Sequence, residues 1–274
     1  MRSIAVMNQK GGVGKTTTAV NLSAALAEAG RRVCLIDLDP QAHASLHVGV
    51  SLREGQPSVY DVLTGDKRFQ DVRQPVATNL WLVPAHLDLA AAEVELAGEV
   101  GREVILRDKL AQDDAAFDYL IVDCPPSLGV LTINALTMVH EVFLPLQPHF
   151  LALHGLSKLL KTIEIVSQRL NPALRLSGVV LCMYDASTRL AAEVSQDVAA
   201  YFQSERTGGV AAQARTFSTR IRRNVRLAEA PSFGQSILEY APTSHGAEDY
   251  RQLAREVLQA EGRASTAPPA RKAA

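Results

Sequence analysis

Three glycines, two lysines and two threonines stand together near the start of the chain, in the segment KGGVGKTT over residues 10–17. The segment lies between a short apolar run, residues 4–7, and a stretch with helical spacing that begins near Thr17. Backbone N–H groups of glycines can converge on phosphate oxygens because no Cβ is in the way, and the start of a helix adds partial positive charge. This strand, loop and helix context predicts a loop that binds nucleotide phosphates.

Individual side chains of the loop are suited to phosphate chemistry. We expect Lys15 to neutralise β- and γ-phosphate oxygens, and the Thr16 hydroxyl to reach Mg²⁺. The usual pattern, GxxxxGK[ST], has a glycine at the position of Gln9, whereas here a second lysine, Lys10, opens the loop five residues before Lys15. The residues predicted to contact the nucleotide are Lys10, Gly11, Gly12, Val13, Gly14, Lys15, Thr16 and Thr17.

Aspartates follow two further apolar runs that are typical of buried parallel strands. Asp37 and Asp39 end the run that starts at Val33, and Asp123 ends the run over residues 119–122. Open α/β sheets bind their ligands at the carboxyl ends of the strands. We expect Asp39 and Asp123 to hold Mg²⁺ or its waters and to orient the attacking water. Asp37 is equally well explained as a strand-end residue that bonds to the loop backbone.

The elements that must position these side chains alternate along the chain. Short β-branched apolar runs recur, and segments with helical spacing separate most of them. This alternation predicts right-handed crossovers and an α/β fold: a doubly wound, mainly parallel sheet with helices on both faces. The expected strands are residues 4–7, 33–38, 80–83, 119–122, 142–146 and 178–182, and the expected helices are residues 17–29, 87–110 and 151–170.

Composition indicates a globular protein without bulk charge. Of its 274 residues, 47% are hydrophobic and 21% charged, with a formal net charge of -1, so nucleic-acid binding would need a local patch. Three scattered cysteines fit a reducing cytoplasm, and no run approaches the ~18 apolar residues of a membrane span. We expect a cytoplasmic protein with one domain over residues 1–260. Residues 261–274 lack large apolar side chains and are expected to form a disordered tail.

A concentrated positive segment lies late in the chain, where residues 213–227 contain five arginines and no acidic residue. Such a segment favours the phosphate backbone of double-stranded DNA. One aromatic residue, Phe217, is too little for base stacking, and no helix-turn-helix pattern precedes the phosphate loop, so we expect no sequence preference. Some of these arginines can instead hold the nucleotide or the seam of a dimer. The candidates are Arg215, Arg220, Arg222, Arg223 and Arg226.

The string KGGVGKTT resembles the deviant phosphate loop of the MinD/ParA group of P-loop ATPases. The resemblance implies ATP and Mg²⁺ as cofactors and an ATP-sandwich homodimer in which Lys10 reaches the phosphates held by the other subunit. It implies that Lys10, Lys15 and Asp39 are catalytic, with Asp39 in the string DLDPQ required for hydrolysis. Asp123, in VDCPPS, resembles the magnesium-site aspartate, so that the implied metal residues are Thr16, Asp39 and Asp123.

Strings further along the chain resemble the ParA/Soj branch of that group, which partitions chromosomes and plasmids. They are PLQP over residues 145–148, MYD over residues 183–185 and RNVRLAEAPSFG over residues 223–234. The branch implies a slow ATPase that binds nucleoid DNA, responds to a ParB-like partner and contacts its nucleotide through Met183. Two positions depart from the pattern: His154 stands where the branch commonly has Glu, and Arg222 where it commonly has Pro.

Two other classes of function stay open. A membrane-surface ATPase of the MinD type would need a terminal amphipathic helix with bulky apolar residues, which residues 261–274 do not provide. A metabolic P-loop enzyme would use ATP for synthesis without contacting a polymer, and the arginine segment and partition-like strings argue against it. Within the leading class, the cargo can be a chromosome, a plasmid or a protein cluster.

Overall fold

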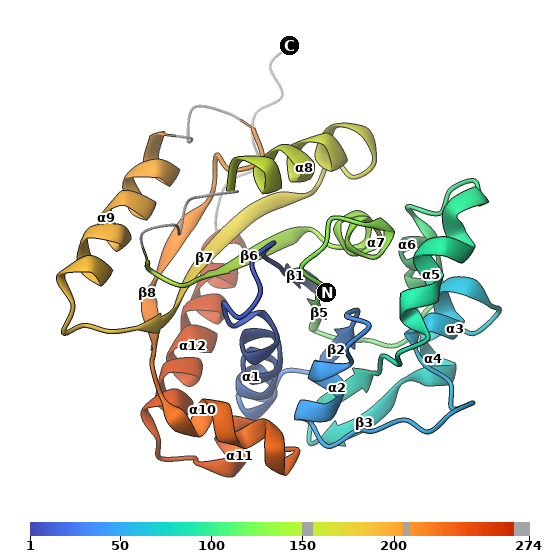
Figure 1. Cartoon of the computed structure of the whole chain (residues 1–274), viewed down its shortest axis with the longest axis horizontal. Helices are drawn as coiled ribbons and strands as arrows, with labels where there is room; N and C mark the ends of the chain where they lie inside the picture. Colours follow the sequence, from blue (N-terminus) through green and yellow to red (C-terminus); the bar gives the residue numbers. More distant parts are fainter. Residues whose placement is uncertain (150–155, 205–208, 266–274) are drawn as a thin grey trace.

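A computed structural model gives the structure of the chain and describes residues 1–149, 156–204 and 209–265 (Figure 1). Within these ranges the chain forms an eight-stranded sheet with the order β3-β4-β2-β5-β1-β6-β7-β8. Neighbouring strands pair in parallel except β3, which is antiparallel to β4. The predicted α/β class with a doubly wound, mainly parallel sheet is therefore confirmed.

The strands expected from apolar runs all form. The central ones are buried along almost their whole length, because helices cover both faces of the sheet. These strands are β1 (Arg2–Val6), β2 (Val33–Asp37), β4 (Leu80–Val83), β5 (Tyr119–Asp123), β6 (Glu141–Leu146) and β7 (Arg175–Tyr184).

Two edge strands were not among the expected elements. β3 (Gln74–Ala77) contains a proline and buries no residue fully, and β8 (Arg215–Arg222) alternates buried and polar side chains. An edge strand needs one apolar face at most, and it tolerates proline because one side of its backbone pairs with no other strand. In β8 polar residues, arginines among them, alternate with the buried apolar side chains of Phe217 and Ile221, so the sequence shows no continuous apolar run there.

Helices pack on the two faces of the sheet around two apolar clusters. One face carries α1 (Lys15–Glu28), α2 (His43–His47), α11 (Ile237–Tyr240) and α12 (His245–Ser265). The other carries α3 (Val59–Thr64), α4 (Phe69–Val72), α5 (Leu89–Glu95), η1 (Leu96–Gly98), α6 (Ile105–Leu110), α7 (Val130–Met138), α8 (Leu156–Arg169) and α9 (Arg189–Ser204). The segments α10 (Val225–Glu229) and η3 (Ala230–Phe233) follow β8. No helix of the described residues is both long and apolar enough to span a membrane.

Two expected boundaries differ from the structure. The helix expected over residues 87–110 is broken into α5, η1 and α6, because η1 ends at Gly98 and Gly101 adopts a left-handed φ of 79°. The tail expected from residue 261 begins inside α12, where Glu261 accepts hydrogen bonds from Tyr119 and Arg31. Residues 266–274 and His154 lie outside the described residues, and the single domain over residues 1–260 stays a prediction.

The parallel register brings the carboxyl ends of three central strands together. Asp123 of β5 lies beside Val6 of β1 on one side and beside Asp37 of β2 on the other. The loop between β1 and α1 and the loop after β2 therefore emerge at the same edge of the sheet. That is the edge at which open α/β sheets bind ligands.

Gly178 of β7 allows Phe217 of β8 to pack against Phe143, with ring centroids 5.0 Å apart. A Cβ at Gly178 would lie 2.2 Å from Cε2 of Phe217. We predict that Gly178→Ala lowers the free energy of unfolding by about 1–3 kcal/mol, because this contact forces the ring to move. Urea denaturation measures the change. Gly98→Ala is the matched control, since no atom lies within 4 Å of its added Cβ, and an equal loss in both variants would contradict the explanation.

Candidate nucleotide site

The loop between β1 and α1 has the backbone of a phosphate cradle. Gly12 and Gly14 adopt left-handed φ angles of 70° and 92°, which side chains with a Cβ rarely tolerate. Gly14 stands at the N-cap of α1 and has no side chain to satisfy the first N–H groups of the helix. At Gly11 and Gly12 an added Cβ would meet no described atom within 4 Å, so the loop faces open space. A phosphate group fits there and satisfies the helix donors.

Both lysines of the loop take part in hydrogen bonds within it. The Nζ of Lys15 donates to the carbonyl of Lys10 at 3.2 Å, and the Lys15 residue is 8% exposed. Burial lowers the pKa of Lys15, while the nearby carboxylates of Asp123 and Asp39 oppose that shift. Lys10 is half-buried, and its backbone N–H donates to Oδ1 of Asn8 at 3.0 Å. The structure thus places the Lys15 ammonium between the loop and the predicted magnesium residues.

The environment of Asp123 favours the binding of a cation. It is fully buried, and neither of its oxygens has a hydrogen-bond partner of standard geometry. Burial raises the pKa of Asp123 well above its ordinary value, and the charge of Asp37 raises it further, whereas the Thr16 hydroxyl and Lys15 act in the opposite direction. A hydrated Mg²⁺ beside Thr16 would provide the missing partners.

The metal would need ligands besides protein carboxylates. In the described part of the chain no group of three His, Cys, Asp or Glu side chains can hold a metal ion by itself. Mg²⁺ at nucleotide sites usually keeps several waters and binds through one or two protein groups plus phosphates. Thr16 and Asp123 fit such a site, with phosphates of the nucleotide completing it.

Asp37, the last residue of β2, and Asp39, in the loop that follows, have different surroundings. Asp37 is fully buried and accepts hydrogen bonds from N and Oγ of Ser45, at 2.8 Å and 2.7 Å, and from N of Asp39 at 3.2 Å. Burial raises the pKa of Asp37 to about 6. These contacts assign Asp37 to the strand-end alternative. Asp39 accepts a hydrogen bond from N of Gln41 at 3.0 Å, is 8% exposed and lies near enough to Lys15 for their charges to interact.

A pocket of about 580 Å³ lies directly beside the phosphate loop and has the size of a nucleoside site. Its phosphate-loop side includes Gly14 and Thr17, and Met183 lines it from the end of β7 with a left-handed φ of 51°. The structure thus brings Met183 to the predicted nucleotide. Another wall is formed by the end of β8 and the segment after it, and its lining residues there are Arg222, Arg223, Asn224, Val225, Leu227 and Ala228.

Sequence analysis left nucleotide contact open for the arginines of this wall, but it did not predict a pocket lined by Asn224, Val225, Leu227 and Ala228. Most of the wall lies within the string over residues 223–234, and the sequence interpretation of that string rested on its arginine charges and not on the course of its backbone. Asn224 caps α10 by accepting from N of Arg226 at 2.9 Å, which fixes the course of the wall. An Asn followed by a short helical segment is the signal that could have predicted this turn.

The five arginines do not form one patch. Arg215 stands at the start of β8 and Arg222 at its end, about 23 Å apart for an extended strand. Arg215 lies over the Phe217 ring at 5.2 Å and lines a different pocket, together with Arg2 and Arg175, at the amino edge of the sheet. The other four arginines lie at the nucleotide edge.

The arginines at the nucleotide edge differ in their partners. Arg220 lies 4.4 Å over the Tyr184 ring and donates to its hydroxyl at 2.6 Å. Arg222 is bound to two carboxylates of α12. Arg226 pairs with Glu229 at 2.9 Å but stays exposed, and Arg223 is exposed with no ion pair at contact distance within the described ranges. Arg220, Arg223 and Arg226 are thus the exposed arginines of the segment, and of these Arg223 and Arg226 lie after the end of β8.

The environment of Asp123 leads to a prediction about stability without nucleotide. Because the pKa of Asp123 is raised in the folded state, the free energy of unfolding falls as pH rises through that pKa. Asp123→Asn should therefore stabilise the nucleotide-free protein at pH 8 by on the order of 1 kcal/mol or more, and less at pH 5. Urea denaturation at both pH values measures this. Asp66→Asn, an exposed control, should show no pH-dependent gain, and equal curves for Asp123→Asn and the wild type would contradict the analysis.

Comparison with known proteins agrees with this geometry. A family model described as an AAA domain matches residues 1–176. Sporulation initiation inhibitor protein Soj of Bacillus subtilis is 46% identical over 255 residues, which cover 93% of this chain and 97% of Soj. Chromosome partitioning protein ParA of Myxococcus xanthus is 44% identical over 258 residues, covering 94% of this chain and 88% of ParA.

The fold also matches a solved structure along nearly its whole length. It is cobyrinic acid a,c-diamide synthase from Mycobacterium smegmatis with a bound ATP analogue and magnesium, which is 38% identical with a TM-score of 0.81 and coverage of 98% of both chains. The matches to Soj and ParA cover 93% and 94% of this chain. The chain therefore belongs to the ParA/Soj family of partition ATPases.

Proposed function

We propose that this ATPase forms an ATP-sandwich homodimer, binds double-stranded DNA without sequence preference, and leaves it when a ParB-like protein stimulates slow hydrolysis. One observation carries the proposal: the wall of the nucleotide pocket and the exposed Arg223 and Arg226 belong to one short segment after β8. Nucleotide contact and positive surface are thus joined in a few residues. The protein would act in the cytoplasm on the nucleoid, where it positions a chromosome, a plasmid or a protein cluster.

ATP and Mg²⁺ are the cofactors, and the protein acts chiefly by positioning them. Backbone N–H groups of residues 11–16 and the Lys15 ammonium hold the phosphates, while Thr16 and Asp123 hold the metal directly or through water. Bound Mg²⁺ neutralises charge on the transferred γ-phosphate. Asp39 orients the attacking water. Lys10 of each subunit reaches the nucleotide of the other, as the family resemblance implies.

Binding to DNA would come from a local surface, because the chain has a net charge of only -1. Arg223 and Arg226 are suited to phosphate contacts because both are exposed. The ion pair between Arg226 and Glu229 is on the surface, and such pairs are weak enough to exchange for a phosphate. The relative ParA is named a chromosome partitioning protein, and that name supports the proposal that this chain acts on DNA.

A second candidate function is supported by the solved structure named as a diamide synthase, which is 38% identical to this chain. In that case ATP turnover would depend on a small acceptor molecule and not on DNA or a protein partner. Soj and ParA are more similar in sequence, at 46% and 44% identity, which favours partition. Measuring ATP turnover with duplex DNA, and separately with a cobyrinic acid acceptor, distinguishes the two.

Asp39→Ala should bind ATP and Mg²⁺ as tightly as the wild type and hydrolyse ATP at least about 10²-fold more slowly, because the proposed role is to orient water. The variant should accumulate as a dimer with ATP. Light scattering and phosphate release measure both effects. Asp66→Ala is the control, and a monomeric Asp39→Ala protein with normal turnover would contradict the role.

Replacing Arg223 and Arg226 together by Ala should weaken ATP-dependent binding to duplex DNA. Each lost phosphate contact should flatten the slope of log affinity against log salt by roughly 0.9. Salt titrations with two unrelated duplexes measure the slope and the sequence preference. Arg215→Ala, at the other end of β8, is the comparison variant that decides whether the amino edge also contacts DNA. Wild-type protein with no salt-sensitive affinity for any duplex would overturn the proposed DNA binding.

A further inference from the structure

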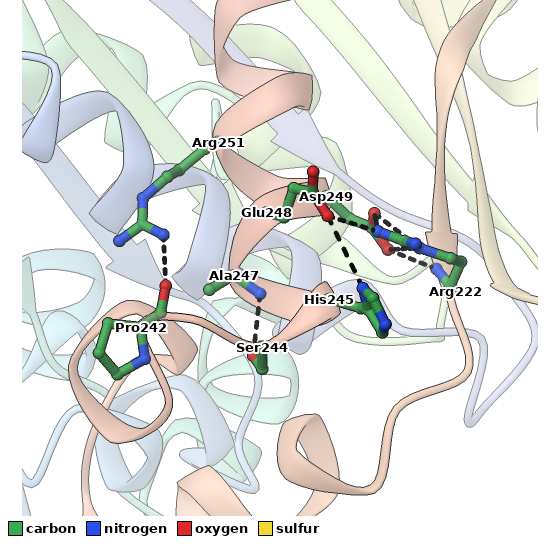
Figure 2. A network of polar contacts seen from close by, with 8 residues as sticks. All are labelled: Arg222, Pro242, Ser244, His245, Ala247, Glu248, Asp249 and Arg251. Atoms are coloured by element: carbon green, nitrogen blue, oxygen red, sulfur yellow. Dashed lines mark hydrogen bonds and ion pairs between the residues drawn. The ribbon is translucent and has the colours of Figure 1, made fainter.

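Arg222 ends the edge strand β8, and its charge is taken up by α12 (Figure 2). Its Nη2 donates to Oδ1 of Asp249 at 2.6 Å and to Oε2 of Glu248 at 3.0 Å, and its Nε lies 3.0 Å and 3.1 Å from the two Asp249 oxygens. The backbone N–H of Arg222 also donates to Asp249, at 2.9 Å. Two carboxylates thus surround one guanidinium, and the cluster as a whole is not positive.

Asp249 is itself fixed by its neighbours on α12. It is 4% exposed, and the next residue, Tyr250, is fully buried with its hydroxyl 3.2 Å from Oγ1 of Thr18 on α1. Arg251 lies on another side of α12, where it pairs with Glu28 of α1 at 2.6 Å and donates to the carbonyl of Pro242 (Figure 2). Because consecutive helical residues point in different directions, α12 joins β8 to the helix that begins at the phosphate loop.

The residue held by this contact lines the nucleoside pocket. Arg222 and residues that follow it line the same pocket as Thr17 and Met183. The wall belongs to a short turn and the five-residue helix α10, none of whose residues is fully buried, and Leu227 is its partly buried apolar contact with the core. The fork of hydrogen bonds to Asp249 is the strongest polar contact of this wall with the rest of the molecule.

We propose that Arg222 is a positioning residue of the nucleotide site, which holds the pocket wall through Asp249, and that it makes no contact with DNA. The proposal rests on the ATP site and not on the proposed DNA binding. Arg222 acts through the wall and has no part in the phosphate cradle, which is built from the loop before α1. Loss of the contact should therefore weaken binding of the nucleoside and spare binding of the phosphates.

The test compares ATP with inorganic tripolyphosphate, each with Mg²⁺, by calorimetric titration. Arg222→Ala and Asp249→Asn should each weaken ATP binding by about 10-fold, because a displaced wall loses its fit to the nucleoside. The double variant should be no weaker than either single variant, since both remove the same contact. Arg222→Lys should bind ATP more tightly than Arg222→Ala but less tightly than the wild type, because an ammonium group can form only some of the hydrogen bonds of the guanidinium. Tripolyphosphate affinity should stay at the wild-type value throughout.

Arg251→Ala is the matched control, because it removes another arginine–carboxylate contact of α12 and Arg251 does not line the pocket. It should leave ATP affinity unchanged. If Arg222→Ala does not fold, Arg222→Lys and Asp249→Asn carry the comparison, since each keeps a hydrogen-bonding group at its position.

Three results would overturn the proposal. They are wild-type ATP affinity in the variants, equal losses for ATP and tripolyphosphate, and a salt slope for DNA that flattens by roughly 0.9 in Arg222→Ala with ATP affinity unchanged. The last result would make Arg222 a DNA contact. Failure of the wild type to bind ATP is a separate outcome, which would overturn the nucleotide site itself and with it this role for Arg222.

Discussion

The buried pair of carboxylates at the ends of β2 and β5 is the constraint on which the site depends. Parallel register places Asp37 beside Asp123, and both are fully buried, so the charge of Asp37 raises the pKa of Asp123 in addition to the effect of burial. The two carboxylates differ in their hydrogen-bond partners. Ser45 donates twice to Asp37 and so holds the start of α2, whereas Asp123 is left for a cation. A stable fold without nucleotide and a strong metal site therefore oppose each other at one residue.

The edge strand β8 imposes a second constraint, because one side of its backbone pairs with no other strand of the sheet. Outward N–H groups of an edge strand attract other chains unless something covers them. Here α12 covers them with two carboxylates seven residues apart: Glu256 accepts from N of Ser218 at 3.0 Å and of Thr219 at 2.6 Å, and Asp249 accepts from N of Arg222 at 2.9 Å. The same helix that protects the edge thus fixes the end of β8, where the nucleotide pocket begins.

The phosphate loop, the central strands and Asp123 could be predicted because each depends on residues close together in the sequence. The partners of Arg222 could not, since Glu248 and Asp249 belong to a different element and a count of charges over residues 213–227 excludes them. The count also ignores that a strand separates Arg215 from the nucleotide edge. Both edge strands escaped for a related reason: they bury one face at most, so their apolar residues are too few to stand out from their polar neighbours.

The place of Arg223 and Arg226 bears on how ATP and DNA can influence each other. A ligand shifts a conformational equilibrium only as far as its affinities for the two states differ, so an effect of ATP on DNA binding requires a structural element that both ligands contact. In the proposed function the segment after β8 is such an element, because its residues line the pocket and two of its arginines, Arg223 and Arg226, are exposed. No long chain of contacts is then needed. Coupling through this segment, in the proposed function, must also be reciprocal: DNA that prefers the ATP-bound form would raise the affinity for ATP by the same factor.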